Sequence, residues 1–275
     1  MTAPGRLYVV ATPIGNMGDL SPRAVETLAS VDLVAAEDTR VSAKLVERAG
    51  SRAKLLSYRD HNENRLAPRL VRRMLSGQSV ALVSDAGTPC ISDPGYRLVQ
   101  QAAEAGIEVV SVSGPSALTA LLSISGLPVN QFSFEGFLPA AAAARRKALI
   151  ALAPCDRTVV FFESPRRVVA LLEDLAELHR DPRVAVGREL TKRHEQVLRG
   201  RASELAALLA EGAVRGEFVV AAFLEASEVG PSAADLRAEV SRLLEAGLSV
   251  RDAAVALKSS GVARRQVYAI ARELR

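Results

Sequence analysis

The chain has 275 residues, of which 49% are hydrophobic and 24% charged, and its formal net charge is +4. These values exclude a disordered or collagen-like chain, and the length predicts about two globular domains. Two cysteines, Cys90 and Cys155, are too few for a disulfide framework, and no apolar segment indicates a signal peptide or a membrane span. We therefore expect a cytoplasmic protein with no membrane contact.

The positive charge is concentrated in blocks. Residues 40–73 carry ten basic side chains against three acidic ones, a net charge of +7, and residues 139–201 and 232–275 are also basic. Basic blocks are typical of proteins that bind a polyanion, although a solvated arginine-rich surface has the same signature.

The first half of the chain alternates apolar runs with helical patterns. Ser21 and Pro22 predict the start of one helix, because serine caps a helix and proline suits its first turn. Another helix is predicted from about Asn64 to Ser76, with Pro68 in its first turn. Strands are expected at 7–11, 33–36, 54–58, 80–83 and 109–112. This alternation predicts a parallel sheet covered on both faces.

The pattern changes near Gly126. Apolar runs with less regular helices between them predict a second α/β domain with a mixed sheet. Its strands are expected at 132–138, 158–162, 184–186, 195–198 and 218–224. The predicted domains are 1–127, 128–230 and 231–275.

The third segment is predicted to be a helical tail that follows a linker at 230–232. Ser249 can cap a helix that runs to Lys258, a turn follows at Ser260 and Gly261, and a last helix covers 264–274. This spacing is typical of a helix-turn-helix, and a helical hairpin packed on the body is the alternative.

Loops of small residues at 12–19, 84–89 and 113–117 each follow a predicted strand. In a parallel sheet they meet at the carboxyl edge, where open α/β folds bind ligands. The chain contains no Gly-Lys-Ser/Thr and no Gly-x-Gly, and its histidines are isolated. We therefore expect a small-molecule site without a phosphate loop, a dinucleotide fingerprint or a metal.

One carboxylate has an unusual position. Glu163 directly follows an apolar strand, and a buried Glu at such a place requires a ligand or an arginine partner.

Seven short motifs occur in a fixed order: TPIGN at 12–16, EDTR at 37–40, SDAGTP at 84–89, SDPG at 92–95, SGPSA at 113–117, FESPR at 162–166 and RELTK at 188–192. In these motifs, and over its whole length, the chain resembles the tetrapyrrole methylase superfamily. Within that superfamily it is most similar to the bacterial enzymes that methylate small-subunit ribosomal RNA.

The resemblance implies two α/β domains that hold S-adenosylmethionine between them, in a homodimer. It also implies methylation of the ribose 2′-oxygen of a cytidine in the decoding centre of 16S ribosomal RNA. The implied cofactor residues are Pro13, Asp85, Ala86, Gly87, Thr88, Ile91, Ser92, Ser113, Ser116 and Ala117 from the first domain, and Phe162, Leu190 and Phe218 from the second. Thr88 departs from the superfamily, which commonly has Asp at this position.

A ribose hydroxyl is a weak nucleophile that benefits from a base. Carboxylates near strand ends are Glu37, Asp38, Glu163 and Glu189, and Lys192 is a further candidate if its pKa is lowered. We select Asp38, Glu163 and Lys192 as catalytic candidates and prefer one of the two carboxylates. The arginines expected to bind RNA phosphates are Arg40, Arg65, Arg69, Arg72, Arg73 and Arg166.

Two other functions remain open. One is methylation of a tetrapyrrole such as a corrin precursor, which has no need of the basic blocks. The other is a ligand sensor whose tail binds DNA, for which the tail is only modestly basic.

Overall fold

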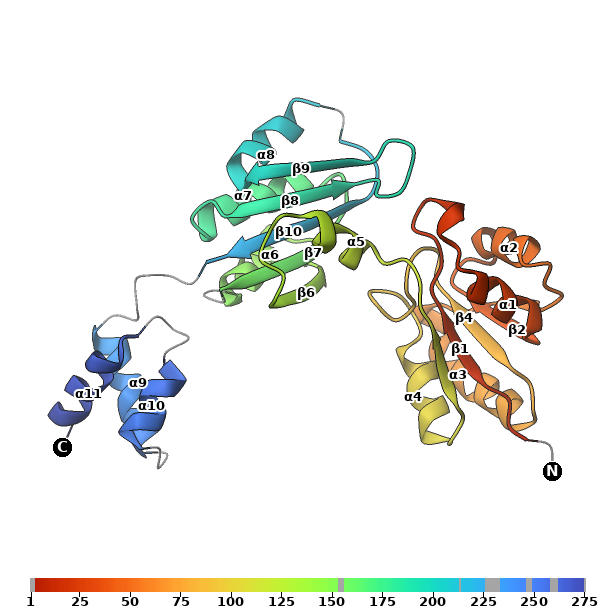
Figure 1. The fold of residues 1–275 in the computed structure, drawn as a ribbon, viewed down its shortest axis with the longest axis horizontal. Coiled ribbons are helices and arrows are strands. Elements are labelled where there is room, and N and C mark those ends of the chain that lie inside the picture. Colours follow the sequence, from red (N-terminus) through yellow and green to blue (C-terminus); the bar gives the residue numbers. More distant parts are fainter. Residues whose placement is uncertain are drawn as a thin grey trace.

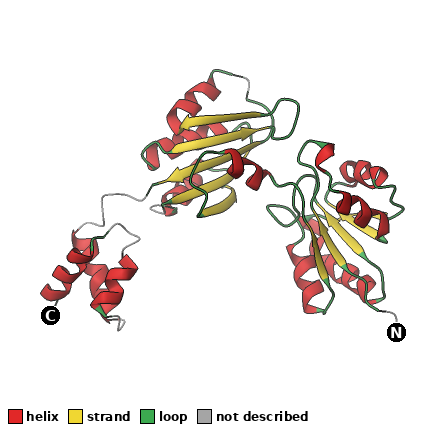
Figure 2. Ribbon diagram, in the orientation of Figure 1, coloured by secondary structure: helices red, strands yellow, loops and turns green. Residues whose placement is uncertain are grey.

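The computed structural model describes residues 3–152, 156–212, 214–225, 233–245, 249–257 and 262–274. These residues form two five-stranded sheets with helices, followed by a helical tail (Figures 1 and 2). The predicted α/β class, with a parallel sheet followed by a mixed one, is confirmed. Within the described residues, no helix has the length and apolar character needed to cross a membrane.

The first sheet has the strand order β3-β2-β4-β1-β5, and all its pairings are parallel. Side chains of α3 and α4 pack on one face of the sheet, and those of α1 and α2 pack on the other. The strands are β1 (Leu7–Val10), β2 (Leu33–Ala36), β3 (Lys54–Ser57), β4 (Val80–Val83) and β5 (Val109–Val112). The helices are η1 (Met17–Asp19), α1 (Pro22–Ser30), α2 (Thr39–Arg48), α3 (Asp60–Leu75) and α4 (Tyr96–Glu104).

The start of α3 differs from the sequence prediction. The helix begins at Asp60 rather than near Asn64, so Pro68 lies inside it and not in its first turn. The cause is local side-chain capping: the backbone N–H of Arg59 donates to Oδ1 of Asn62 at 2.9 Å. Capping starts the helix before the apolar periodicity begins, which is why periodicity placed it too late.

The second sheet has the order β6-β7-β10-β8-β9, in which only β6 and β7 are parallel. Helices α6, α7 and α8 cover one face, and α5, which follows the first sheet in the chain, packs on the other. The strands are β6 (Phe132–Phe137), β7 (Arg157–Glu163), β8 (Arg183–Arg188), β9 (Gln196–Arg201) and β10 (Phe218–Leu224). The helices are α5 (Ala117–Ile124), α6 (Ala142–Ala151), α7 (Val168–Leu178) and α8 (Ala202–Ala210).

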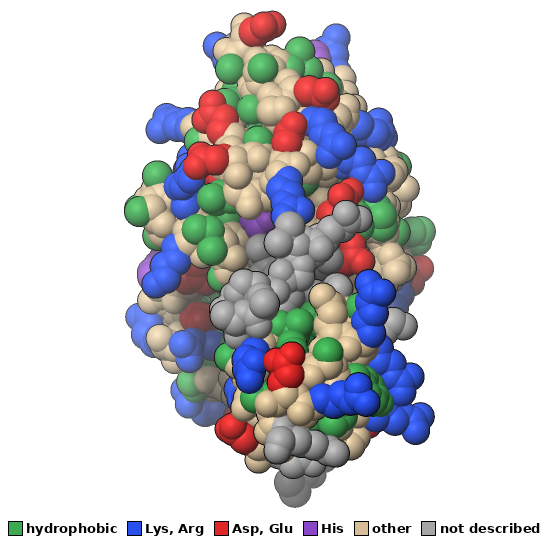
Figure 3. All heavy atoms as spheres, turned by 90° about the vertical axis from the view of Figure 1, so that its left-hand side faces the viewer, with side chains coloured by type: hydrophobic (Ala, Val, Ile, Leu, Met, Phe, Trp, Pro, Cys, Tyr) green, Lys and Arg blue, Asp and Glu red, His purple; other side chains and the backbone are tan. Residues whose placement is uncertain are grey.

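The tail contains α9 (Ala233–Glu245), α10 (Val250–Ala256) and α11 (Arg264–Glu273), which share an apolar core. The hydroxyl of Ser249 accepts the N–H of Asp252, which confirms the predicted cap of α10. The predicted linker and the turn at Ser260 and Gly261 lie outside the described residues, and the domain boundaries remain predictions. Seen from the side of the tail, the surface mixes basic and acidic side chains (Figure 3).

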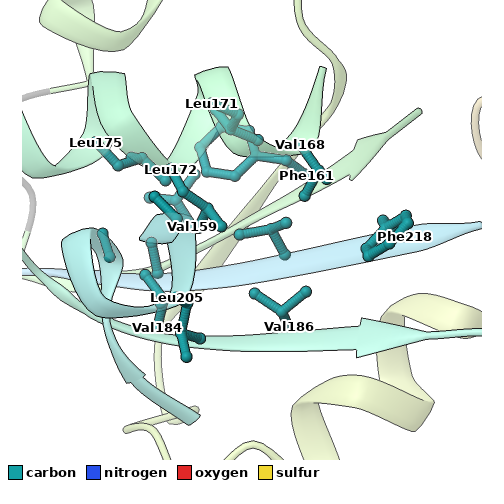
Figure 4. Packing of buried hydrophobic residues seen from close by; sticks show 14 of the residues in the cluster. Val159, Phe161, Val168, Leu171, Leu172, Leu175, Val184, Val186, Leu205 and Phe218 are labelled. Atoms are coloured by element: carbon teal, nitrogen blue, oxygen red, sulfur yellow. The ribbon is translucent and has the colours of Figure 1, made fainter. Parts of the chain in front are cut away.

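We expect Phe161→Ala to lower the free energy of unfolding by about 3–5 kcal/mol, because it leaves a cavity that the surrounding core fills only in part. Phe161 is fully buried, and in Figure 4 its ring lies beside Leu171 and Leu172 of α7. Chemical denaturation provides the measurement. The control Ile150→Ala removes a side chain that is 58% exposed and should change stability little. Equal losses in the two variants would contradict this view of the core.

Candidate active site

A cavity of about 450 Å³ lies between the two sheets. One wall comes from loops at the carboxyl edge of the parallel sheet and from the start of α5. The opposite wall comes from the ends of β6, β7 and β10 and the residues next to them. The cavity therefore lies at the sheet edge where the small-residue loops were predicted to meet.

Hydrogen bonds connect the three loops of small residues to one another on one side of the cavity. The backbone N–H groups of Thr12 and Gly87 each donate to the other's carbonyl, at 2.8 and 3.0 Å. The hydroxyl of Thr88 donates to the carbonyl of Pro115 at 3.2 Å. Gly87 has a φ of +82°, a conformation that favours glycine. The threonine that departs from the superfamily pattern thus connects the second loop to the third.

The cavity brings together most of the residues implied to bind the cofactor. Those in its lining are Asp85, Ala86, Gly87, Thr88, Ile91, Ser92, Ser116, Ala117, Phe162 and Phe218. Pro13, Ser113 and Leu190 are not in the lining, and Leu190 is buried in the apolar cluster that includes α5.

Glu163 is the only one of the three catalytic candidates in this lining. Its side chain is fully buried, and Oε1 accepts bonds from the Arg167 guanidinium and the Ser164 N–H, both at 2.7 Å. The arginine partner expected for a buried Glu at this place is therefore present. Within the described structure, Oε2 of Glu163 has no hydrogen-bond partner. A buried carboxylate oxygen without a donor is costly, so this atom is suited to receive a bond from a ligand.

Asp38 has a structural role instead. Its carboxylate accepts the N–H of Arg40 at the start of α2 and pairs with the guanidinium groups of Arg40 at 2.6 Å and Arg59 at 3.4 Å. The hydrogen bonds from Arg40 hold the pKa of Asp38 well below its usual range. Asp38 is therefore a poor proton acceptor near neutral pH, and it is not in the cavity lining.

Lys192 could act as a base only if its pKa were lowered, and its surroundings have the opposite effect. Burial disfavours its charge, but hydrogen bonds to Glu189 at 2.8 Å and Glu217 at 3.1 Å outweigh burial and raise the pKa of Lys192. Its Cγ lies only 2.3 Å from where a Cβ on Gly15 would be, so glycine is required there. Lys192 thus holds its proton and packs the second half of the chain against the first loop.

Three carboxylates, Glu37, Asp85 and Asp93, form an acidic wall of the same cavity. Of these, Asp93 was not among the candidate site residues of the sequence analysis. Burial, together with the nearby charge of Glu37, raises the pKa of Asp93 to about 7. Burial and the charge of Asp85 raise the pKa of Glu37. A bound cation would relieve this repulsion. Asp93 belongs to the SDPG motif, but only the fold shows how close these carboxylates are.

The arginines expected to bind RNA lie outside the cavity lining. Arg65, Arg69 and Arg72 are carried on α3 together with Arg73, and Arg65 is exposed. Among the residues that the structure describes, none of these four has a carboxylate within ion-pair distance. Arg40 is paired with Asp38, and Arg166 is exposed beside the cavity residue Pro165.

Residues 6–206 match the sequence model of the tetrapyrrole (corrin/porphyrin) methylases. A ribosomal RNA small subunit methyltransferase I from Xylella fastidiosa is 52% identical over 80% of this chain and 82% of the relative. One from a Synechocystis strain is 44% identical over 98% of both chains. A crystal structure of uroporphyrin-III C-methyl transferase from Thermus thermophilus, complexed with S-adenyl homocysteine, has a TM-score of 0.55. It is 20% identical and covers 79% of this chain and 97% of that one.

We expect Asp93→Asn to stabilise the ligand-free protein, with a larger gain at pH 8 than at pH 5. Folding raises the pKa of Asp93 from its ordinary value of 3.8 to about 7. Between these values the unfolded chain releases a proton that the folded protein retains, so wild-type stability falls as pH rises through this window. Denaturant titrations at both pH values measure the difference. The control is Asp19→Asn, an exposed position outside the cavity lining. A gain independent of pH would contradict the assignment.

Proposed function

The chain belongs to the tetrapyrrole (corrin/porphyrin) methylases and, within them, to the ribosomal RNA small subunit methyltransferase I family, and from this we propose its reaction. The proposed reaction is methylation of the ribose 2′-oxygen of a cytidine in the decoding centre of 16S ribosomal RNA. The carrying observation is a cavity with an acidic wall, an aromatic wall and a buried carboxylate oxygen that lacks a donor in the described structure.

The residues of the cavity fit S-adenosylmethionine, the methyl donor of the family. When bound, the cofactor supplies an electrophilic methyl group on a positively charged sulfur. Phe162, Phe218 and Val219 offer an apolar surface suited to a purine, and Glu37, Asp85 and Asp93 favour a cation. A volume of about 450 Å³ is within the range of small-molecule sites.

Glu163 is the proposed proton acceptor. Arg167 and the Ser164 N–H hold Oε1, which orients the carboxylate, while Oε2 can accept a hydrogen bond from the ribose hydroxyl and then its proton. Correct placement of the hydroxyl supplies much of the remaining acceleration, because methyl transfer is an in-line displacement.

Helix α3 is the proposed binding surface for the RNA backbone. The Nε–H of Arg59, just before α3, donates to the carbonyl of the cavity residue Glu37 at 2.8 Å, so the helix starts beside the cavity. From there its 16 residues extend about 24 Å at the rise of an α-helix. Arg65, Arg69 and Arg72 are spaced as neighbours along one helix face, which suits successive phosphates.

We further propose that the protein is a cytoplasmic homodimer and that it meets its RNA within the small ribosomal subunit. The family resemblance supports both statements.

The decisive experiment offers labelled S-adenosylmethionine with either undermethylated small subunits or a corrin precursor. We expect 2′-O-methylcytidine in 16S ribosomal RNA and no labelled tetrapyrrole. Glu163→Gln should lower kcat by about 100-fold or more, because a positioned base contributes at least this much. Glu177→Gln, at an exposed carboxylate outside the cavity lining, is the control and should retain activity. Label on the tetrapyrrole alone would overturn the proposal.

We expect the triple variant Arg65→Ala, Arg69→Ala, Arg72→Ala to bind RNA more weakly and with a shallower dependence on salt. Each lost phosphate contact reduces the log–log slope by roughly 0.7–0.9. Fluorescence anisotropy at several salt concentrations measures this, and cofactor affinity should not change. Arg6→Ala with Arg97→Ala is the control, since these exposed arginines already have carboxylate partners. An unchanged slope in the triple variant would contradict the assignment.

A further inference from the structure

Strand β6 contains a bulge close to the cavity. In its pairing with β7, Phe134 lies opposite Val160, Gly136 opposite Phe161 and Phe137 opposite Phe162, so Glu135 is the extra residue. Gly136 has a φ of +61°, which favours glycine, and a Cβ there would lie 3.0 Å from Oγ of Ser92. The bulge therefore requires glycine at position 136, and it lies against Ser92 of a loop that lines the cavity.

The bulge decides where Phe137 points. Side chains alternate between the two faces of a strand, so residues three apart normally face opposite ways. Because of the extra residue, Phe137 lies on the same face of the sheet as Phe134, Val160 and Phe162. This is the face that packs against α5. Without the bulge, Phe137 would lie on the face covered by α6, α7 and α8.

Phe137 is held on one side and open on the other. Its ring packs edge-to-face on Phe162, with the centroids 5.7 Å apart, and Phe162 packs in the same way on Phe134 at 4.8 Å. Phe137 nevertheless remains 57% exposed while it lines the cavity. It is an aromatic surface at the cavity mouth, supported from behind by two further rings.

We propose that Phe137 is the platform on which the base of the target nucleotide stacks. This inference rests on the proposed function, because proteins that bind single-stranded or unpaired RNA commonly hold its unstacked bases against aromatic side chains. Stacking on an aromatic ring compensates for the lost stacking and accepts any base, since every base has a π-face. Phe137 is thus a positioning residue, which holds the nucleotide so that its 2′-hydroxyl faces the cavity.

The same strand provides a matched control. Phe132 is 46% exposed at the other end of β6 and is not in the cavity lining. We expect Phe137→Ala to raise KM for small-subunit RNA by about 5- to 150-fold, the range for loss of one stacked base. The Kd for S-adenosylmethionine should stay within about twofold of wild type, and Phe132→Ala should match wild type throughout. Phe137→Leu keeps an apolar side chain without a flat ring, so it should behave like Phe137→Ala even if the alanine variant folds poorly.

A second readout does not depend on turnover. The chain has no tryptophan, so Phe137→Trp introduces a single tryptophan, whose fluorescence can be excited apart from that of the four tyrosines, and it also restores an aromatic face. We expect near-wild-type KM for this variant and quenching of its fluorescence by the RNA substrate, whereas Phe132→Trp should show no quenching.

The outcomes separate this inference from the proposed function. If the wild-type protein does not methylate the RNA, the proposed function fails, whatever the variants do. If wild type is active and both Phe137→Ala and Phe137→Leu keep its KM for RNA, the stacking role is overturned. A matching loss of cofactor affinity would also overturn it, because Phe137 would then be a cofactor contact.

Discussion

The burial of α5 against the second sheet is the contact on which the rest of the site depends. This helix continues directly from the loop after β5 of the first sheet, and its first residues line the cavity. Leu121 and Leu122 are buried among Val160, Ala185 and the other apolar residues of that face. One continuous segment therefore belongs to both halves, and the apolar area it buries holds the two walls of the cavity at a defined separation.

Opposite charges are kept apart on this scaffold. Carboxylates gather on the cavity wall, where burial and mutual repulsion raise the pKa of Glu37 and Asp93. Arginines without acidic partners in the described structure lie along α3, outside the cavity lining. The small net charge conceals these two regions. A cationic ligand suits the first and a polyanion suits the second, so the proposed cofactor and RNA need not compete for the same charges.

Much of the site could be predicted because sheet geometry links sequence to space. Apolar strands alternating with helices predict a parallel sheet, and the loops after its strands share one edge. The family resemblance, and not periodicity, implied the thirteen cofactor residues, and ten of them line the cavity, including Phe162 and Phe218 from the second sheet. Side-chain partners could not be predicted in this way. The ion pairs of Asp38 with Arg59 and of Lys192 with Glu217 join residues that are far apart in the chain and depend on their rotamers. The pKa of Asp38 is lowered and that of Lys192 is raised, so neither group is a good base.

By itself the sequence determined the fold class, most of the strands, the position of the ligand edge and the family, because these follow from local periodicity and from ordered motifs. Only the tertiary structure decided which carboxylate has an oxygen without a donor among the described residues, which acidic side chains repel one another and which phenylalanine faces the cavity mouth. Periodicity predicts which faces are buried, but burial of a charge depends on its exact neighbours. In β6, a single extra residue reverses the side to which Phe137 points.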